Sequence, residues 1–296
     1  MNISEAKIAR DASGRALAHN DRRIGGILAE QGKLDGRDIR RVLELQQTEG
    51  LRFGEASLRL KLITVEDLHH AIARQYGLPH LLPDNERVSS ELVVAYEPFH
   101  PCAEEIRALR THLLIRWARG TMRGCMLAIV SASHGDGRSY LVANLAVAFS
   151  QLGQRTLLID ADLRQPRQHR IFDVPDRVGL SAVLGGRGGR SAVVALPEFG
   201  PLSLLPAGAC PPNPMELLSR DAFAALLREL QPDFDVILFD TPPTESCADA
   251  HGVAFRSGNV LIVARRNRSR LAATDGLVAQ MTNAGAHAVG TVFNAF

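Results

Sequence analysis

Lysine is nearly absent from this sequence. Lysine and arginine together number 34 among the 296 residues, yet only Lys7, Lys33 and Lys61 are lysine. A cationic phosphate ligand beyond residue 61 must therefore be an arginine. Aromatic residues are also scarce, at 5%, and the basic residues form no continuous block. These absences exclude a base-stacking platform and a basic arm, so we expect no nucleic acid partner.

The sequence also lacks the usual marks of secreted and membrane proteins. Its four cysteines form no C-x-x-C pair, which disfavours a cysteine-based zinc site or a disulfide framework and is typical of a reducing compartment. They are Cys102, Cys125, Cys210 and Cys247. No apolar run approaches the ~18 residues of a membrane span, and residues 1–15 lack the apolar core of a signal peptide. We therefore expect a cytoplasmic protein.

Two patterns divide the chain, whose 46% apolar and 22% charged residues are those of a globular protein. Short helical patterns come first, and apolar strands alternating with helical patterns follow. We expect a flexible N-terminus over 1–20 and a small helical repeat domain over 21–82. A linker over 83–97, around a polar stretch with a proline, would lead to an α/β domain over 98–296.

The small helical domain contains a tandem repeat. The tripeptide Arg-Ile-Gly at 23–25 recurs as Arg-Phe-Gly at 52–54. Each unit continues with an apolar i, i+4 pair, which places two apolar side chains on one helix face. A duplicated helical hairpin with glycine at close contacts explains this pattern without any ligand.

This repeat resembles the N-terminal domain of type II secretion and pilus ATPases, the MshEN-type domain, over residues ~20–82. The first unit fits that pattern throughout, whereas the second departs from it at Ser57 and Lys61. Some members of that family bind cyclic di-GMP through the arginine and the backbone around the glycine, and others serve only for docking. The resemblance therefore implies either a docking module or a cyclic di-GMP site. The residues of that site would be Arg23, Gly25, Arg52 and Gly54.

A strand, a glycine-rich loop and a helix follow one another around residue 135. Residues 126–132 form an apolar run of strand length, 133–139 carry the loop SHGDGRS, and 140–153 have helical apolar spacing. In such a loop, backbone N–H groups and the helix N-terminus bind phosphate oxygens, and the following hydroxyl ligates Mg²⁺. The sequence therefore predicts a nucleotide phosphate site. Its residues are Gly135, Asp136, Gly137, Arg138, Ser139 and Tyr140.

Carboxylates end two further apolar segments. Asp160 and Asp162 follow one predicted strand, and Asp240 ends another. The carboxyl ends of parallel strands meet at the crevice where doubly wound sheets bind ligands. A single aspartate there would be an ordinary helix cap, but three beside a phosphate loop favour a magnesium site. Its ligands would be Ser139, Asp162 and Asp240.

The order of the segments predicts an α/β fold with a doubly wound, mostly parallel sheet of the P-loop NTPase type, preceded by the helical repeat domain. Strands are expected at 126–131, 155–160, 202–206, 235–240, 259–264 and 288–293. Helices are expected at 139–152, 215–230 and 271–284.

Over residues 98–296 the sequence resembles the bacterial tyrosine kinases of capsule and exopolysaccharide synthesis, and among them the EpsG-type kinases that accompany a chain-length determinant. The resemblance rests on VSASHGDGRS, LLIDADLRQP, PAGACPPNPMELL, VILFDTPP and GTVFN, in the order of that family. It implies ATP and Mg²⁺ as cofactors and Asn294 at the adenine. It also implies that Arg138, Asp160 and Asp162 are the catalytic residues, with Asp160 accepting the hydroxyl proton or ordering the metal.

An E-x-x-R-x-x-R segment stacks Glu104, Arg107 and Arg110 on one helix face. Salt bridges on an exposed helix would explain this spacing. In the kinase family, however, the motif drives self-association into rings, so a homo-oligomer is implied. The resemblance also implies a membrane partner, the polysaccharide co-polymerase or chain-length determinant, that would hold the chain at the inner membrane.

Two features depart from that family. Arg138 stands where the phosphate loop ordinarily has lysine, and the family's closing tyrosine cluster is not in this sequence. The tyrosines present are Tyr76, Tyr96 and Tyr140, of which Tyr96 is the expected accessible acceptor.

Two functions therefore stay open. One is a protein-tyrosine kinase that regulates exopolysaccharide polymerisation, export and chain length. The other is a catalytically weak, ATP-gated assembly protein of the same machinery, which would also respond to cyclic di-GMP if the helical repeat domain binds it. A partitioning ATPase of the MinD or ParA type is disfavoured, because the signature lysine of its phosphate loop is absent.

Overall fold

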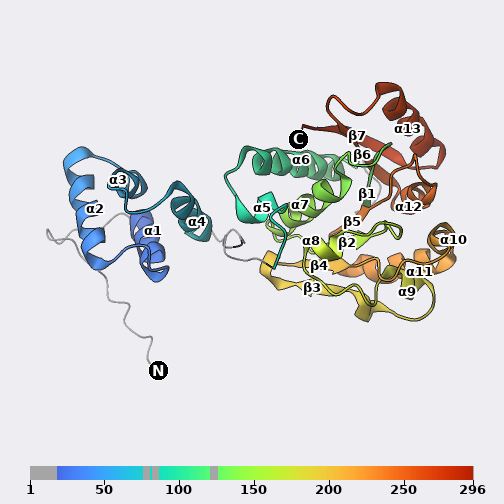
Figure 1. Cartoon of the computed structure of the whole chain (residues 1–296), viewed down its shortest axis with the longest axis horizontal. Coiled ribbons are helices and arrows are strands. Elements are labelled where there is room, and N and C mark those ends of the chain that lie inside the picture. Colours follow the sequence, from blue (N-terminus) through green and yellow to red (C-terminus); the bar gives the residue numbers. More distant parts are fainter. Residues whose placement is uncertain (1–18, 76–80, 82–86, 121–125, 296) are drawn as a thin grey trace. The chain divides into compact units, whose positions relative to one another are not determined.

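The computed structural model describes residues 19–75, 81, 87–120 and 126–295. Most of the expected flexible N-terminus, and Tyr76, lie outside these residues. The chain divides into two compact units, Met1–His80 and Leu81–Phe296 (Figure 1). Each unit has a hydrophobic core of its own.

Helices make up the described part of the first unit: α1 (His19–Glu30), α2 (Gly36–Glu49), α3 (Phe53–Arg59) and α4 (Val65–Gln75). Their apolar faces meet in a small core around Phe53. The repeat glycines lie at close contacts. A Cβ on Gly25 would come within 2.9 Å of the Phe53 ring, and one on Gly54 within 2.7 Å of Leu68. Close packing therefore accounts for both glycines.

The second unit is built on a seven-stranded sheet with the order β3-β4-β2-β5-β1-β6-β7. Neighbouring strands are parallel except β3 with β4, which confirms the predicted doubly wound, mostly parallel α/β fold. The strands are β1 (Met126–Val130), β2 (Thr156–Asp160), β3 (Val194–Leu196), β4 (Leu202–Leu205), β5 (Val236–Asp240), β6 (Asn259–Arg265) and β7 (His287–Asn294). The central strands are continuous apolar runs because helices cover both of their faces.

Two layers of helices enclose the sheet (Figure 1). One face packs against α5 (Val93–Tyr96), α6 (Pro101–Ala118), α7 (Arg138–Ser150) and α8 (Gln168–Ile171). The other packs against α9 (Leu180–Leu184), α10 (Pro214–Ser219), α11 (Asp221–Leu230), α12 (Asp249–Ser257) and α13 (Leu271–Asn283). The helix predicted at 215–230 is in fact two helices, because Arg220 between them has extended backbone.

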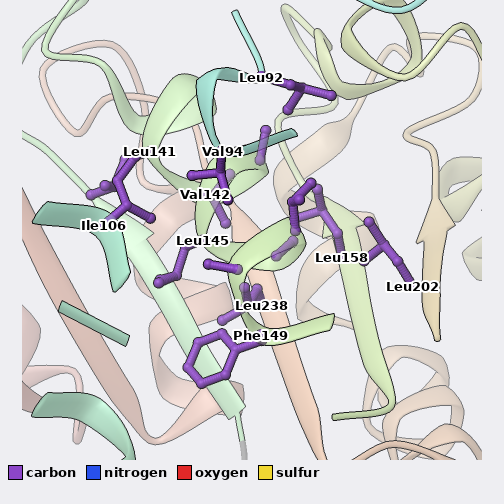
Figure 2. Close-up of a cluster of buried hydrophobic side chains, with 14 of the residues drawn as sticks. Leu92, Val94, Ile106, Leu141, Val142, Leu145, Phe149, Leu158, Leu202 and Leu238 are labelled. Carbon is purple, nitrogen blue, oxygen red and sulfur yellow. The ribbon is translucent and has the colours of Figure 1, made fainter. Parts of the chain in front are cut away.

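The expected linker is wrong for residues 87–97, which we call the strap. The strap is part of the second unit, where Leu92 and Val94 are fully buried against α7 (Figure 2). The side chain of Asn144 on α7 accepts a hydrogen bond from Val94 N (3.1 Å) and donates one to Glu91 O (2.8 Å). The apolar run ELVVAY explains this docking, since leaving it exposed would forfeit the free energy of apolar burial.

Candidate nucleotide and phosphoryl-transfer site

The glycine-rich loop connects β1 to α7 in the predicted strand–loop–helix order. Gly135 (φ +76°) and Gly137 (φ +95°) have left-handed backbone, which a residue with a Cβ rarely adopts. Asp136 is buried and acts as a brace, because its carboxylate accepts hydrogen bonds from Ser133 N (3.0 Å) and Ser269 Oγ (2.7 Å). Asp136 thus holds the shape of a glycine-rich loop of the kind that binds phosphate in other proteins.

The Arg138 side chain turns inward beneath the loop and is only 7% exposed. Its Nε donates to Thr241 O (2.7 Å), and its Nη1 donates to Ser133 O (3.0 Å) and to Ser131 Oγ. Two of the three guanidinium nitrogens are therefore bound to acceptors of the protein. These bonds join the phosphate loop to the end of β5.

Asp160 and Asp240 are fully buried and lie opposite each other in the register of β2 and β5. Burial raises the pKa of Asp160 well above that of an ordinary aspartate, and the neighbouring Asp240 carboxylate raises it further. Burial also raises the pKa of Asp240, against the opposing effects of the Gln168 hydrogen bond and the Arg138 charge. The sheet therefore holds two buried carboxylates, both less acidic than an ordinary aspartate, at the edge where the phosphate loop lies.

Gln168 is a residue of this site that the sequence reasoning missed. Its Nε2 donates to Asp240 Oδ2 (2.7 Å) and to Ser139 O (3.1 Å), and its backbone N donates to Asp160 Oδ2 (3.0 Å). It ties both acidic strand ends to the phosphate loop. No local signal in the sequence marks it, since these contacts depend on how the loop after β2 folds back.

The residues fit a magnesium ion that is shared with phosphate. Asp240 Oδ1 is buried and has no well-formed hydrogen bond among the described residues, while Ser139 lies beside this carboxylate. Within the described ranges, no three His, Cys, Asp or Glu side chains form a preformed metal cage. Mg²⁺ needs none, because it takes one or two protein ligands together with phosphate oxygens and water.

A cavity of about 580 Å³ opens over the phosphate loop. Its lining residues are Glu91, His134, Gly135, Gly137, Arg138, Ser139, Tyr140, Asp162, Gln165, Arg167 and Arg265. Asp162 thus lines the cavity as expected of a residue near the reacting groups. Asp160 does not line it and is fully buried, with both oxygens accepting backbone hydrogen bonds: Oδ1 from Asp162 N and Oδ2 from the N of Arg167 and of Gln168.

Two further predicted ligands have protein partners in this structure. Asn294 donates from Nδ2 to Asp136 O (3.2 Å), so it lies against the phosphate loop. Tyr140 lines the cavity with its hydroxyl 3.3 Å from Cys102 Sγ, and burial raises the pKa of the Tyr140 phenol. Tyr96 was the expected accessible acceptor, but it is half-buried and its hydroxyl donates to Val88 O (2.7 Å). That expectation is therefore wrong for the conformation seen here.

An arginine-rich loop at 265–270 also meets the phosphate loop and was not predicted. Arg265 donates from Nη1 to Gly135 O (3.3 Å), and Ser269 connects this loop to Asp136. The segment RRNRSR would have been the signal for it in the sequence.

The predicted oligomerisation residues lie on α6 as expected, but all three have partners within the chain. Arg107 donates to Pro98 O and to Glu104, and Arg110 donates to Ala148 O (2.8 Å) near the end of α7. Glu104 is exposed, at 64% of its side chain. No helix in the described part of the chain is long and apolar enough to cross a membrane.

In the first unit, Arg52 is exposed and precedes α3 as its N-cap residue, while the side chain of Arg23 lies outside the described residues. The arginine pair of the predicted cyclic di-GMP site therefore stays a prediction.

A parallel sheet with a glycine loop, a following hydroxyl and acidic strand ends defines a P-loop nucleotide-binding protein. The family model of the cellulose biosynthesis protein BcsQ matches residues 125–275. The putative tyrosine-protein kinase CapB of Staphylococcus aureus is 35% identical over 208 residues, which are 69% of this chain and 89% of that protein. The tyrosine-protein kinase YwqD of Bacillus subtilis is 36% identical over 60% of this chain and 74% of that protein.

A solved structure agrees with these likenesses. The kinase domain of the Escherichia coli tyrosine kinase ETK has a TM-score of 0.65 and 29% identity, over 69% of this chain and 79% of that one. The chain belongs to the family of bacterial tyrosine kinases.

Proposed function

We propose that the second unit transfers the γ-phosphoryl group of MgATP to a tyrosine hydroxyl of another protein chain, and so regulates exopolysaccharide polymerisation, export and chain length. In this transfer a bond forms between the tyrosine oxygen and the γ-phosphorus. The bond from that phosphorus to the bridging oxygen of ADP breaks. The observation that carries the proposal is the convergence of the phosphate loop, Ser139 and Asp162 on one cavity.

The residues divide the work by position. The loop N–H groups and Arg138 would neutralise phosphate charge, and Ser139 with Asp240 would hold Mg²⁺, which offsets charge on the transferring group. Asp162 lies in the cavity wall and is placed to accept the phenolic proton. Asp160 is buried and would position Asp162, whose backbone N donates to Asp160 Oδ1 (3.2 Å).

The acceptor tyrosine would come from a different chain. The hydroxyl groups of Tyr96 and Tyr140 are partly buried and have neighbours within the chain. A membrane-bound polysaccharide co-polymerase would bring the kinase to the inner membrane and activate it, as the family resemblance implies. A homo-oligomer formed through α6 belongs to the same proposal.

Incubation with γ-labelled ATP and Mg²⁺ tests this function, with and without the cytoplasmic segment of the membrane partner. Phosphotyrosine mapping is expected to find label on the added chain, and Asp162→Asn should remove it. Nucleotide binding without any labelled tyrosine under either condition would contradict phosphoryl transfer.

That outcome would favour the second candidate, an ATP-gated assembly protein. One observation supports it: the Arg138 guanidinium is bound to Thr241 O and Ser133 O, so it is not free to follow the transferring group. For the first unit we propose a docking or cyclic di-GMP-binding role, on the sequence repeat alone.

A further inference from the structure

A second arginine lies at the cavity and is held by a carboxylate. Arg167 Nη2 is 2.7 Å from Glu91 Oε1, and both residues line the cavity with Ser139 and Asp162. The two side chains are 49% and 40% exposed, so water reaches the pair and the bond between them is readily exchanged.

The backbone places Arg167 at the phosphate end of the cavity. Its N–H donates to Asp160 Oδ2 (3.1 Å), and the next residue, Gln168, donates to the carbonyl of Ser139 (3.1 Å). Ser139 is the hydroxyl residue of the phosphate loop. The Arg167 side chain therefore starts from a rigid segment next to the place where the terminal phosphate of a nucleotide would lie.

Arg138 is engaged by acceptors of the protein, so a second cation could contact the terminal phosphate. Its Nε and Nη1 are engaged by Thr241, Ser133 and Ser131 on the inner side of the loop. Arg265 also lines the cavity, but its Nη1 donates to Gly135 O. Arg167 is held by a side-chain carboxylate, which can move away, whereas these two arginines donate to backbone carbonyls fixed in the fold and, for Arg138, also to the Ser131 hydroxyl.

We propose that Arg167 is a catalytic residue that binds the γ-phosphoryl group of the nucleotide, and that Glu91 holds it in the nucleotide-free state. A guanidinium presents paired N–H donors that match two phosphate oxygens, and phosphate carries more negative charge than the Glu91 carboxylate. Arg167 exchanges Glu91 for the γ-phosphoryl group and neutralises the charge that transfer develops there. The inference rests on the proposed function for its catalytic part, but the γ-phosphate contact stands without turnover.

The chain supplies a matched control for a purely structural role of this ion pair. Arg87 Nε is 3.2 Å from Asp173 Oδ2, and this pair links the strap to the segment just after α8, whereas Glu91 and Arg167 link it to the residue just before α8. Arg87 and Asp173 do not line the cavity. If Arg167 only fastens the strap, loss of Arg87 must have the same effect on nucleotide binding as loss of Arg167.

The test measures the affinity of the full chain, with Mg²⁺, for a non-hydrolysable ATP analogue and for ADP. Arg167→Gln is expected to weaken the analogue about tenfold or more, which is the value of one charged hydrogen bond, and to leave ADP within about twofold. Glu91→Gln is expected to strengthen analogue binding, because it removes both the competing partner and a nearby negative charge. Arg87→Gln should change neither affinity, and Arg167→Lys should restore only part of the loss.

Equal weakening of the analogue and of ADP by Arg167→Gln would overturn the proposal, as would an equal effect of Arg87→Gln. Phosphotyrosine formation is measured on the same variants to separate the two proposals. A γ-specific affinity loss in a chain that labels no tyrosine refutes the kinase function and keeps Arg167 as a nucleotide ligand. Wild-type labelling with unchanged affinities in Arg167→Gln refutes the role of Arg167 alone.

Discussion

Removing the Arg138 guanidinium is expected to damage the fold as well as the nucleotide site. The side chain is buried and donates three hydrogen bonds, to Thr241 O, Ser133 O and Ser131 Oγ. In Arg138→Ala these three acceptors lose their donor in a place that water reaches poorly. At about 1 kcal/mol for each bond, the loss is about 3 kcal/mol, out of a total stability of about 5–15 kcal/mol for a typical protein.

Thermal unfolding without nucleotide measures this loss. A domain of this size changes its melting temperature by about 2–4 °C for each kcal/mol, so Arg138→Ala should melt about 6–12 °C below wild type. Arg138→Lys keeps the charge and some of the donors, and should lose less than half as much. Arg228→Ala on α11 is the control, because Arg228 is exposed and its loss should leave the melting temperature unchanged.

Nucleotide affinity completes the experiment. Arg138→Ala should also weaken MgATP binding, whereas Arg138→Lys should preserve it and raise turnover, since a compact ammonium can follow the transferring group. A variant Arg138→Ala that melts with wild type and binds MgATP equally well would refute both roles. Arg138 would then be neither a brace nor a phosphate ligand, and the phosphate loop would be misassigned.

Three other outcomes follow from the geometry. Asp240→Asn should abolish Mg²⁺-dependent nucleotide effects; in metal-free buffer at neutral pH it should also raise the melting temperature. Burial raises the folded-state pKa of Asp240, so the contribution of this carboxyl to stability is present at low pH and is lost as pH rises through that pKa. An unchanged Mg²⁺ response in Asp240→Asn would contradict the assignment of Asp240 as a metal ligand. Glu104→Arg should shift the oligomer toward monomer in sedimentation. It is a cleaner test than reversing Arg107 or Arg110, because those two also bind the backbone oxygens of Pro98 and Ala148, whereas Glu104 is exposed and pairs with Arg107 on its own helix. An unchanged distribution would leave the motif as surface decoration. In calorimetry on the full chain, Arg52→Ala should reduce the heat of cyclic di-GMP binding less than Arg23→Ala does. If the wild-type chain gives no heat, the docking role is the one that stands.

The part of the site that could be predicted depends on local patterns. A buried strand, a glycine loop and an apolar helix are consecutive in the sequence, so the phosphate loop could be found without knowing the rest of the fold. Asp160 and Asp240 could be placed together because both end apolar strands of one parallel sheet, and they do face each other in register. Chain order and periodicity were sufficient for these features.

The parts that could not be predicted depend on contacts between distant segments. Gln168 binds Asp240, 72 positions away, and Asn144 binds the strap about 50 positions before it. The expected linker was wrong because a proline and charged residues at its start concealed the apolar residues that follow. Asp160 was expected among the reacting groups, but Asp162 is the one that lines the cavity. A sequence does not show which of two nearby carboxylates becomes buried and which lines a cavity.

The substitution of arginine for lysine in the phosphate loop has a structural consequence. A lysine offers one compact charge, whereas a guanidinium is wide and must find several acceptors wherever it is buried. Here Thr241 O, Ser133 O and Ser131 Oγ supply them, and this draws the charge of Arg138 to the inner side of the loop. Phosphate binding must compete with those bonds, because the same donors cannot satisfy both fully. A loop of this kind gains from a second cation at the same cavity, and Arg167, whose guanidinium pairs with the Glu91 carboxylate, lines that cavity.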